Sequence, residues 1–219
     1  MYRSPNQVSP SHPNKSITVY GTGIIQMEPQ ISKATVGIVT ENMNLSTAQK
    51  ENAIIQQRVV QNLLTSGIAK ENIQTVEYTI FPQYDYIDNK QVFNGYQVTH
   101  MLAIQMDDIP STGTIVDMAI QSGANRVTNI AFDVINRTEY YQKALQKALK
   151  DALQKAYTIA NTLQMKLDPT PTKILEIPAN NIPMPLTAMA KSNVGFSTNI
   201  EAGLLKVEAN LEVKFQYLS

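Results

Sequence analysis

The stretch Tyr140–Ala160, Y-Y-Q-K-A-L-Q-K-A-L-K-D-A-L-Q-K-A-Y-T-I-A, carries an alanine at every fourth residue. A lane of alanines lets a helix axis approach a sheet or another helix closely. The sequence therefore predicts a long helix that packs through small side chains, with leucines filling the flank of the contact. The alanines are Ala144, Ala148, Ala152, Ala156 and Ala160, and the leucines are Leu145, Leu149 and Leu153.

Three lysines fall on the opposite face of this predicted helix, Lys143, Lys147 and Lys150. They could form a binding face, but the chain as a whole balances 18 basic residues against 18 acidic ones. A neutral chain is not expected to attract nucleic acid or anionic lipid over long distances. A solvated face is therefore the preferred interpretation.

The first β-prone run, Ile17–Pro29, reads I-T-V-Y-G-T-G-I-I-Q-M-E-P and contains a Gly-x-Gly. A dinucleotide fingerprint would need a third glycine and a helix whose N-terminus faces the phosphates. Gln26 occupies the third position here, and Pro29 would interrupt a helix that began at Gly23. Gly21 and Gly23 are better explained by a β-bulge, or by another backbone that comes close.

Two strand–helix–strand units follow one another, over Ala34–Ile80 and again over Val98–Val134. Apolar residues alternate in the predicted strands and recur at helical spacing between them. Each helix ends in Ser-Gly, in S-G-I-A-K-E-N-I and in S-G-A-N-R-V-T-N-I, where a glycine cap belongs. We interpret the units as related halves of one sheet system; chance similarity of two glycine-capped helices is the alternative.

The C-terminal run Leu205–Tyr217 alternates apolar and polar side chains almost without a fault, which predicts a long antiparallel strand with one wet face. The predicted fold class is α+β: two strand–helix–strand units, a long Ala-rich helix and a long C-terminal antiparallel strand. Segment 1–15 is predicted to be a disordered tail. Residues 16–219 are predicted to form one domain, with a long Pro- and Met-rich loop at about 178–202.

Composition excludes several classes of site. Without cysteine the chain has no disulfide framework, thiol nucleophile or Cys-based metal site. Its two histidines, His12 and His100, are far apart and do not suggest zinc, so neither a metal nor another cofactor is expected.

No apolar run approaches the ~20 residues of a membrane-spanning helix. The N-terminus lacks the apolar core of a secretory signal, and if it is native we expect the protein to stay in the cytoplasm.

Candidate ligand or interface residues cluster around one predicted turn. The motifs F-P-Q-Y-D-Y and N-G-Y place Tyr84, Tyr86 and Tyr96 near it, and His100 follows on the same predicted strand. Aromatic rings can stack on a ligand, although such residues often shape a hairpin and its sheet edge instead. No catalytic residue is predicted, because serine-nucleophile signatures are absent and His100 has no identifiable partner for base catalysis.

Taken together, the motifs resemble the SIMPL domain family, which includes periplasmic immunogen-type proteins of bacteria. The order of the motifs over about residues 16–217 is that of the family. Two positions depart from it: Gln30 stands where relatives often have Asp, and Gln164 lies where they commonly end the long helix with Gly. The matching features are V-Y-G-T-G with Pro29, G-I-x-x-x-N-I-Q-T at Gly67–Thr75, F-P-Q-Y-D-Y, N-G-Y, S-G-A-N at Ser122–Asn125, the alanine ladder and the terminal strand.

The resemblance implies an α+β domain of unknown function without an established catalytic site. It also implies envelope- or stress-related roles, ring-like oligomers in some members, and an extracytoplasmic location if a signal was removed. Our hypothesis is a non-enzymatic binding or scaffold protein that forms a homo-oligomer, with a further protein partner also allowed. The contacts would involve a sheet edge left by the last strand, the segment 178–202, or both. The alternative is a small-ligand binder or enzyme with a pocket near the aromatic turn 81–96.

Overall fold

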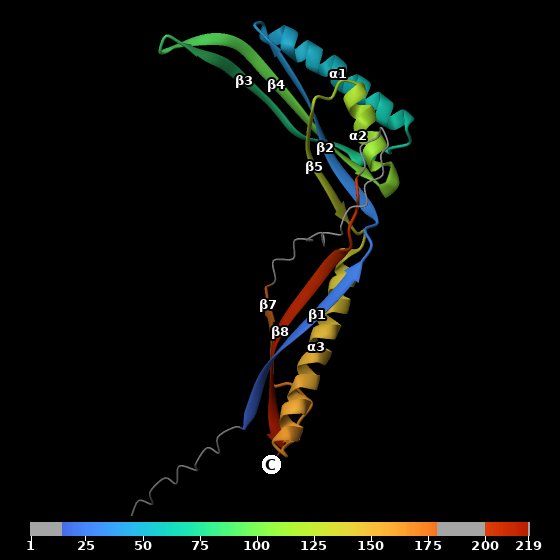
Figure 1. Cartoon of the computed structure of the whole chain (residues 1–219), viewed down its shortest axis with the longest axis vertical. Helices are drawn as coiled ribbons and strands as arrows, with labels where there is room; N and C mark the ends of the chain where they lie inside the picture. The colour runs from blue at the N-terminus through green and yellow to red at the C-terminus, as the bar shows by residue number, and fades with distance from the viewer. Residues whose placement is uncertain (1–14, 179–199, 219) are drawn as a thin grey trace, which may run out of the picture. The chain divides into compact units, whose positions relative to one another are not determined.

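The computed structural model of the chain describes residues 15–178 and 200–218, which form two compact units (Figure 1). The predicted tail and the predicted Pro- and Met-rich loop lie outside the described residues, apart from Lys15, Pro178 and 200–202. Of the described residues, one unit comprises 27–137 and 200–205, and the other comprises 15–26, 138–178 and 206–218.

Within the described residues the chain forms three α-helices, two short 3-10 turns and eight strands. This composition confirms the predicted α+β class. The elements are β1 (Ser16–Met27), β2 (Ile31–Asn42), α1 (Leu45–Thr65), η1 (Lys70–Asn72), β3 (Ile73–Ile87), β4 (Lys90–Met106), η2 (Ile109–Ser111), α2 (Thr112–Gln121), β5 (Arg126–Asp133), α3 (Arg137–Thr162), β6 (Lys166–Leu167), β7 (Lys173–Ile177) and β8 (Leu205–Leu218).

The two predicted strand–helix–strand units are β2-α1-β3 and β4-α2-β5, and they interlock in one sheet of order β3-β4-β2-β5. The first strands of the two units, β2 and β4, pair antiparallel in the middle, with Ile38 opposite His100. Each outer strand then pairs with the first strand of the other unit. The two strand–helix–strand segments are therefore halves of one sheet, as the sequence predicts.

Helices α1 and α2 cover the same face of this sheet (Figure 1). Their apolar side chains pack with Val36 and Leu102 of the central strands into one core. Asn52 of α1 is buried among them, and its Nδ2 donates to the carbonyl oxygens of Ile38 at 3.0 Å and Val98 at 3.2 Å. One polar side chain thus ties the helix to both central strands.

The S-G-A-N motif joins α2 to β5, and its glycine and its asparagine each have a structural role there. Gly123 has a φ angle of +113°, and a Cβ there would lie 2.8 Å from Ile55 Cγ2. Asn125 follows and pairs with the backbone of Val39: its Nδ2 donates to the carbonyl oxygen at 2.8 Å, and its Oδ1 accepts from the N–H at 2.9 Å. The side-chain amide therefore continues the ladder that β5 makes with β2.

In the compact unit of residues 15–26, 138–178 and 206–218, β8 is the central strand of the sheet. Its apolar side chains from Leu205 to Phe215 alternate as buried positions, so the predicted one-sided strand is confirmed. One edge of β8 pairs with β1, and the other pairs with β6 and β7. The expectation of an open edge on this strand was wrong over Asn210–Lys214 and Tyr217–Leu218, where β7 and β6 pair with it. Alternation reports which face is buried and not which edges are paired.

The alanine lane of α3 packs against the two glycines of β1, and α3 runs beside β1 and β8 in Figure 1. A Cβ built on Gly21 would lie 2.0 Å from the carbonyl oxygen of Ala148, and one on Gly23 would lie 1.9 Å from that of Ala144. The five alanines of the lane are fully buried. The predicted close approach of another backbone is confirmed. Of the flanking leucines, Leu149 is exposed.

Three side chains of α3 cap the outer edge of β1, which has no neighbouring strand among the described residues. Lys147 Nζ donates to the carbonyl oxygen of Ile24 at 3.2 Å, and Lys155 Nζ donates to that of Tyr20 at 2.9 Å. Between them, Asp151 Oδ2 accepts from the N–H of Thr22 at 2.8 Å. Lys147 therefore contacts the sheet, which corrects the prediction of a purely solvated lysine face.

Gln164, where relatives in the family commonly have glycine, lies in the turn that ends α3. The backbone N–H of Gln164 donates to Asn161, and that of Met165 donates to Ala160. This closing turn puts Gln164 at a φ angle of +54°, a conformation that glycine adopts without steric penalty. The helix therefore ends where relatives commonly place glycine, in spite of the glutamine.

We predict that Gly21→Ala lowers the free energy of unfolding by about 3 kcal/mol, the upper end for an overpacked core. The added Cβ would overlap the carbonyl oxygen of Ala148, and backbone yields less than a flexible side chain. Urea denaturation followed by circular dichroism measures the change. Thr18→Ala, at an exposed position of the same strand, is the control and should change stability far less. Equal effects would show that the close contact is not rigid.

Candidate functional site

The hairpin of β3 and β4 projects beyond the N-terminal end of α1 (Figure 1). Its strands pair from Ile73, opposite Ile104, down to the turn. At the tip, Asp88 and Asn89 have φ angles of 51° and 60°. Two successive positive φ angles are typical of a type I′ turn, whose twist matches that of the strands. The local sequence thus builds a regular hairpin that carries its side chains away from the core.

The N-G-Y motif forms a β-bulge in β4. The register against β3 shifts here and leaves Asn94 without an opposite residue. Gly95 has a φ angle of +118°, and a Cβ there would lie 2.9 Å from the carbonyl oxygen of Asn42. Because a bulge inserts one residue, it reverses the alternation of side chains along the strand. Phe93 and Tyr96 therefore project from the same face.

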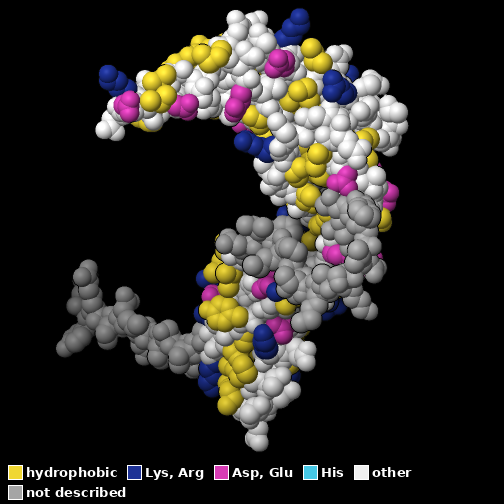
Figure 2. All heavy atoms as spheres, turned by 45° about the horizontal axis from the view of Figure 1, so that its top comes forward, with side chains coloured by type: hydrophobic (Ala, Val, Ile, Leu, Met, Phe, Trp, Pro, Cys, Tyr) yellow, Lys and Arg dark blue, Asp and Glu magenta, His cyan; other side chains and the backbone are white. Residues whose placement is uncertain are grey.

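Three aromatic side chains make contact on this face, and we call Tyr84, Phe93 and Tyr96 the aromatic row. The ring centroids of Tyr84 and Phe93 are 5.7 Å apart, and those of Phe93 and Tyr96 are 5.1 Å apart, both edge to face. Tyr84 is 46% exposed and Phe93 is 37% exposed. Figure 2 shows hydrophobic side chains along the projecting hairpin. The row is ordered by its own contacts and still offers apolar surface to a partner.

His100 belongs to a second cluster, further along β4. Its Nε2 lies 2.9 Å from Oγ1 of Thr75, and its ring meets that of Tyr78 edge to face at 5.3 Å. Gln49 of α1 donates to the Tyr78 hydroxyl at 3.5 Å. Partial burial lowers the pKa of His100 below its ordinary value of 6.5, because desolvation disfavours the charged imidazolium.

The four predicted site residues are therefore divided between places on one hairpin. Tyr84 and Tyr96 join the aromatic row, whereas His100 contacts Tyr78. Tyr86 lies nearer the turn, with 77% of its surface exposed. Phe93 was missed, because strict alternation puts odd- and even-numbered residues on opposite faces. The signal that could have found it is the glycine of N-G-Y, since a glycine inside a strand often marks a bulge.

The outer edge of the hairpin is the second feature of the site. β3 stands at the end of its sheet, so the side turned away from β4 has no strand partner among residues 15–178 and 200–218. None of its fifteen residues is fully buried. Pro82 removes one backbone donor from the strand, but the other backbone groups of this edge remain available for pairing. A free edge of this length is a template for another chain.

Among the described residues, no three His, Asp or Glu side chains lie close enough together to hold a metal ion. None of the described helices combines the length and the apolar character needed to span a membrane. The hairpin provides ring surfaces and main-chain hydrogen-bonding groups, which are the chemistry of recognition.

Its three helices and two antiparallel sheets place the described part of the chain in the α+β class. The chain belongs to the SIMPL family, described as a protein of unknown function (DUF541), whose model matches residues 17–215. The resemblance seen in the sequence is thereby confirmed.

Two relatives illustrate the similarity. Over 203 residues the chain is 23% identical to the uncharacterized protein YggE of Escherichia coli (strain K12), which covers 91% of this chain and 82% of the relative. Over 175 residues it is 23% identical to the 26 kDa periplasmic immunogenic protein of Brucella melitensis, which covers 78% of this chain and 70% of the relative.

The lowered pKa of His100 predicts a specific acid dependence of stability. Well above pH 6.5 the imidazole is neutral in the folded and unfolded chains alike. As the pH falls through that value, the unfolded chain takes up a proton that the folded chain resists, so the free energy of unfolding decreases. The decrease is complete below the lowered pKa of the folded state. Urea midpoints from neutral pH down to about pH 5 measure it.

In His100→Gln this part of the acid dependence should disappear, because glutamine does not titrate. His12→Gln, at the other histidine of the chain, is the matched control. An unchanged pH profile in His100→Gln would contradict the assignment.

Proposed function

We propose that this chain is a non-enzymatic binding or scaffold protein that self-associates through the hairpin of β3 and β4. The observation that carries the proposal is the coincidence of two features on one hairpin: the exposed aromatic row and an outer edge without a partner strand among the described residues. Main-chain pairing along an edge fixes the register of an added strand, and aromatic contacts add apolar area.

A second copy of the chain is the partner that the charge balance favours. The chain has a formal net charge of zero, so two copies do not repel each other at long range. A contact between identical edges is antiparallel and closes on itself through a twofold axis, which is the commonest symmetry of soluble oligomers. Each copy then covers the outer edge of the other, and Tyr84 and Tyr86 of the two β3 strands lie next to the contact.

The use of the family motifs supports a role that is not enzymatic. The glycines of V-Y-G-T-G allow the contact with α3. The glycine of N-G-Y adopts a positive φ angle in a bulge, and the asparagine of S-G-A-N pairs with β2. Each of these motifs is accounted for by backbone geometry, which leaves no unexplained set of reactive side chains among them.

An extracytoplasmic location is part of this proposal. The printed name of the Brucella relative describes a periplasmic protein. We expect the native protein to be released with the periplasmic fraction when the outer membrane is opened by osmotic shock, and immunoblotting against a cytoplasmic marker measures this. Retention with the cytoplasmic marker would contradict the location without affecting the proposal of self-association.

Self-association is tested by light scattering coupled to size exclusion over a concentration series. We expect an oligomer at micromolar concentration for the unaltered chain. Tyr84→Lys combined with Tyr86→Lys should raise its dissociation constant by about tenfold or more, since lysines facing each other across a twofold contact repel and lose hydration. Tyr157→Lys, at a 40% exposed tyrosine of α3, is the matched control and should leave the assembly intact.

A monomer for the unaltered chain at high micromolar concentration would sink this proposal. Equal weakening by the control would show that added charge, and not the hairpin, is responsible. A ligand-specific thermal shift that Tyr96→Ala abolishes would instead favour a small-ligand binder with its pocket near 81–96.

A further inference from the structure

Part of the aromatic row lies one strand away from the outer edge of β3. Phe93 and Tyr96 belong to β4, which pairs with β3 on its inner side. A strand added to the outer edge lies beside β3 in the plane of the sheet, so it does not cover side chains that project from the face of β4. Phe93 is 37% exposed. The face of the row is therefore open to a further segment.

The row offers hydrogen-bond donors as well as apolar rings. Tyr84 and Tyr96 stand at its two ends, with Phe93 between them. Within the part of the chain that the structure describes, neither tyrosine hydroxyl makes a hydrogen bond. A ring for apolar contact beside a free hydroxyl suits a segment in the polyproline II conformation, whose carbonyl oxygens have no partners of their own.

The length of the row matches the repeat of such a segment. The ring centroids along the row are 5.7 and 5.1 Å apart, so Tyr84 and Tyr96 lie no more than about 11 Å from each other. A polyproline II helix has three residues per turn and rises ~3.1 Å per residue, so prolines three residues apart lie on one side, about 9 Å apart. A P-x-x-P segment can therefore place one proline ring at each tyrosine.

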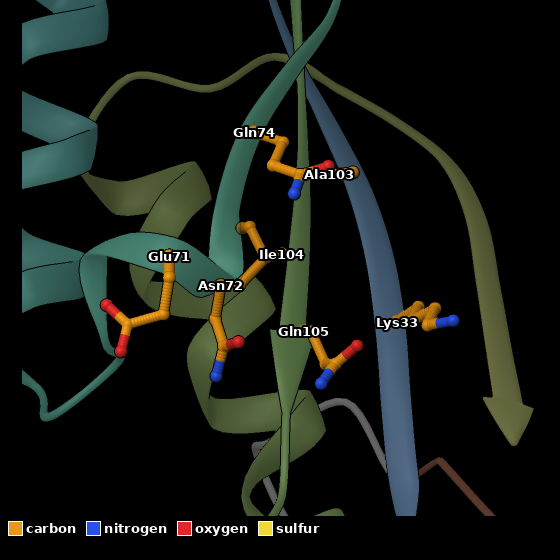
Figure 3. A pocket seen from close by; sticks show the side chains of 7 residues that line it. All are labelled: Lys33, Glu71, Asn72, Gln74, Ala103, Ile104 and Gln105. Carbon is orange, nitrogen blue, oxygen red and sulfur yellow. The ribbon is translucent and has the colours of Figure 1, made fainter. Parts of the chain in front are cut away.

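A hollow of about 230 Å³ on the same sheet, away from the hairpin turn, is a weaker candidate (Figure 3). Lys33 and Glu71 line it from opposite flanks. Lys33 Nζ lies 3.7 Å from Oδ2 of Asp133. Because the charged side chains of the hollow do not converge, its lining indicates no class of ligand. The aromatic row is therefore the surface to which we assign a partner.

The sequence of this chain contains one P-x-x-P, Pro10-Ser-His-Pro13. It lies in segment 1–15, which has a further proline at Pro5. Proline fixes its own φ angle near that of polyproline II, and it biases the preceding residue toward extended conformations. Such a sequence loses less conformational entropy on binding than an unrestricted one.

Charge complementarity favours the same segment. Residues 1–15 carry two basic residues and no acidic one. Residues 73–97, which include the hairpin, carry three acidic residues and one lysine. Opposite charges attract over distances up to the Debye length, ~10 Å at moderate salt. The charged residues are Arg3 and Lys15 in the segment, and Glu77, Asp85, Asp88 and Lys90 in the hairpin.

We propose that the aromatic row binds the P-x-x-P segment of a second copy of this chain. The two prolines of the segment lie against the outer rings of the row, Tyr84 and Tyr96, and its carbonyl oxygens accept hydrogen bonds from their hydroxyls. The inference rests on the proposed function, because it takes a second copy as the partner. It adds a contact to edge pairing, and two linked contacts bind more tightly than either alone.

A fluorescein-labelled peptide of residues 1–15 is the probe. The protein is the full-length chain with Pro10→Ala and Pro13→Ala, so that its own segment does not compete. Fluorescence anisotropy should saturate with a dissociation constant on the order of 100 μM. A peptide of the same composition in scrambled order, without P-x-x-P, should bind about tenfold more weakly, because it keeps the charges and loses the spacing. Equal binding of the two peptides would overturn the proposal.

A variant connects the peptide to the row. Tyr84→Ala in the same protein should weaken peptide binding by about tenfold, because it removes one ring and one hydroxyl. Tyr157→Ala, at a 40% exposed tyrosine of α3, is the matched control and should leave the affinity unchanged. Circular dichroism reports whether each variant folds. If Tyr84→Ala does not fold, backbone amide NMR shifts caused by the peptide decide: they should map to the row, and shifts elsewhere would overturn the proposal.

Dilution distinguishes a second copy from the chain's own segment. In the isotopically labelled unaltered chain, the amide shifts of the row should change with protein concentration. On dilution they should approach the shifts of the double proline variant, because the copies separate. A difference between the two proteins that stays the same at every concentration would assign the contact to the chain's own segment and overturn the proposal.

Light scattering separates this inference from edge pairing. The double proline variant should still form an oligomer, with its dissociation constant raised by about tenfold because one of two linked contacts is lost. An oligomer that does not bind the peptide would overturn the segment contact alone. Peptide binding by a chain that stays monomeric at high micromolar concentration would overturn edge pairing alone.

Discussion

The sheet of β3, β4, β2 and β5 depends on the antiparallel pairing of β2 with β4. It joins residues from Ser32 to Asn42 with residues from Met106 to Tyr96 without a break in register. Because these are the first strands of the two halves, the pairing determines which helix lies beside which and where each outer strand is added. Asn52 strengthens it, since its amide bonds to a carbonyl oxygen of each strand. The hairpin is the continuation of β4 beyond this paired region.

The sequence predictions that were confirmed rest on the regular spacing of apolar and small residues. The alanine lane, the alternation of the last strand and the two Ser-Gly helix ends each report a repeated local geometry, and each was found where expected. What periodicity does not encode is the identity of neighbours. The pairing of both edges of β8 by β1 and by β6 and β7 could not be read from its own residues. The position of Phe93 escaped for a related reason, because one inserted residue reverses the alternation on which the reading rests.

The two departures from the family pattern can also be understood from their contacts. Gln30 Oε1 accepts a hydrogen bond from the N–H of Ile135 at 3.1 Å, a role that an aspartate oxygen could also perform. Gln164 instead occupies a left-handed position that favours glycine. One substitution keeps an acceptor, and the other accepts a small steric penalty at a helix end. Of the candidate site, the sequence could indicate Tyr84 and Tyr96. It could not indicate that the outer edge of β3 lacks a partner strand among the described residues, because strand order depends on segments that are distant in the sequence.

The capped edge of β1 has a consequence for the dynamics of the strand. In a paired strand an amide proton exchanges with solvent only when two backbones separate, whereas the amide proton of Thr22 is held by the carboxylate of Asp151. Its exchange is therefore controlled by the rotation of one side chain, a motion far faster than strand separation. The hydrogen bond from Lys155 holds the pKa of Asp151 below its ordinary value, so the carboxylate stays ionised and remains an acceptor in mildly acidic solution. Side chains of α3 thus make the hydrogen bonds on the outer edge of β1 that a neighbouring strand would otherwise make. These bonds open as fast as the side chains rotate.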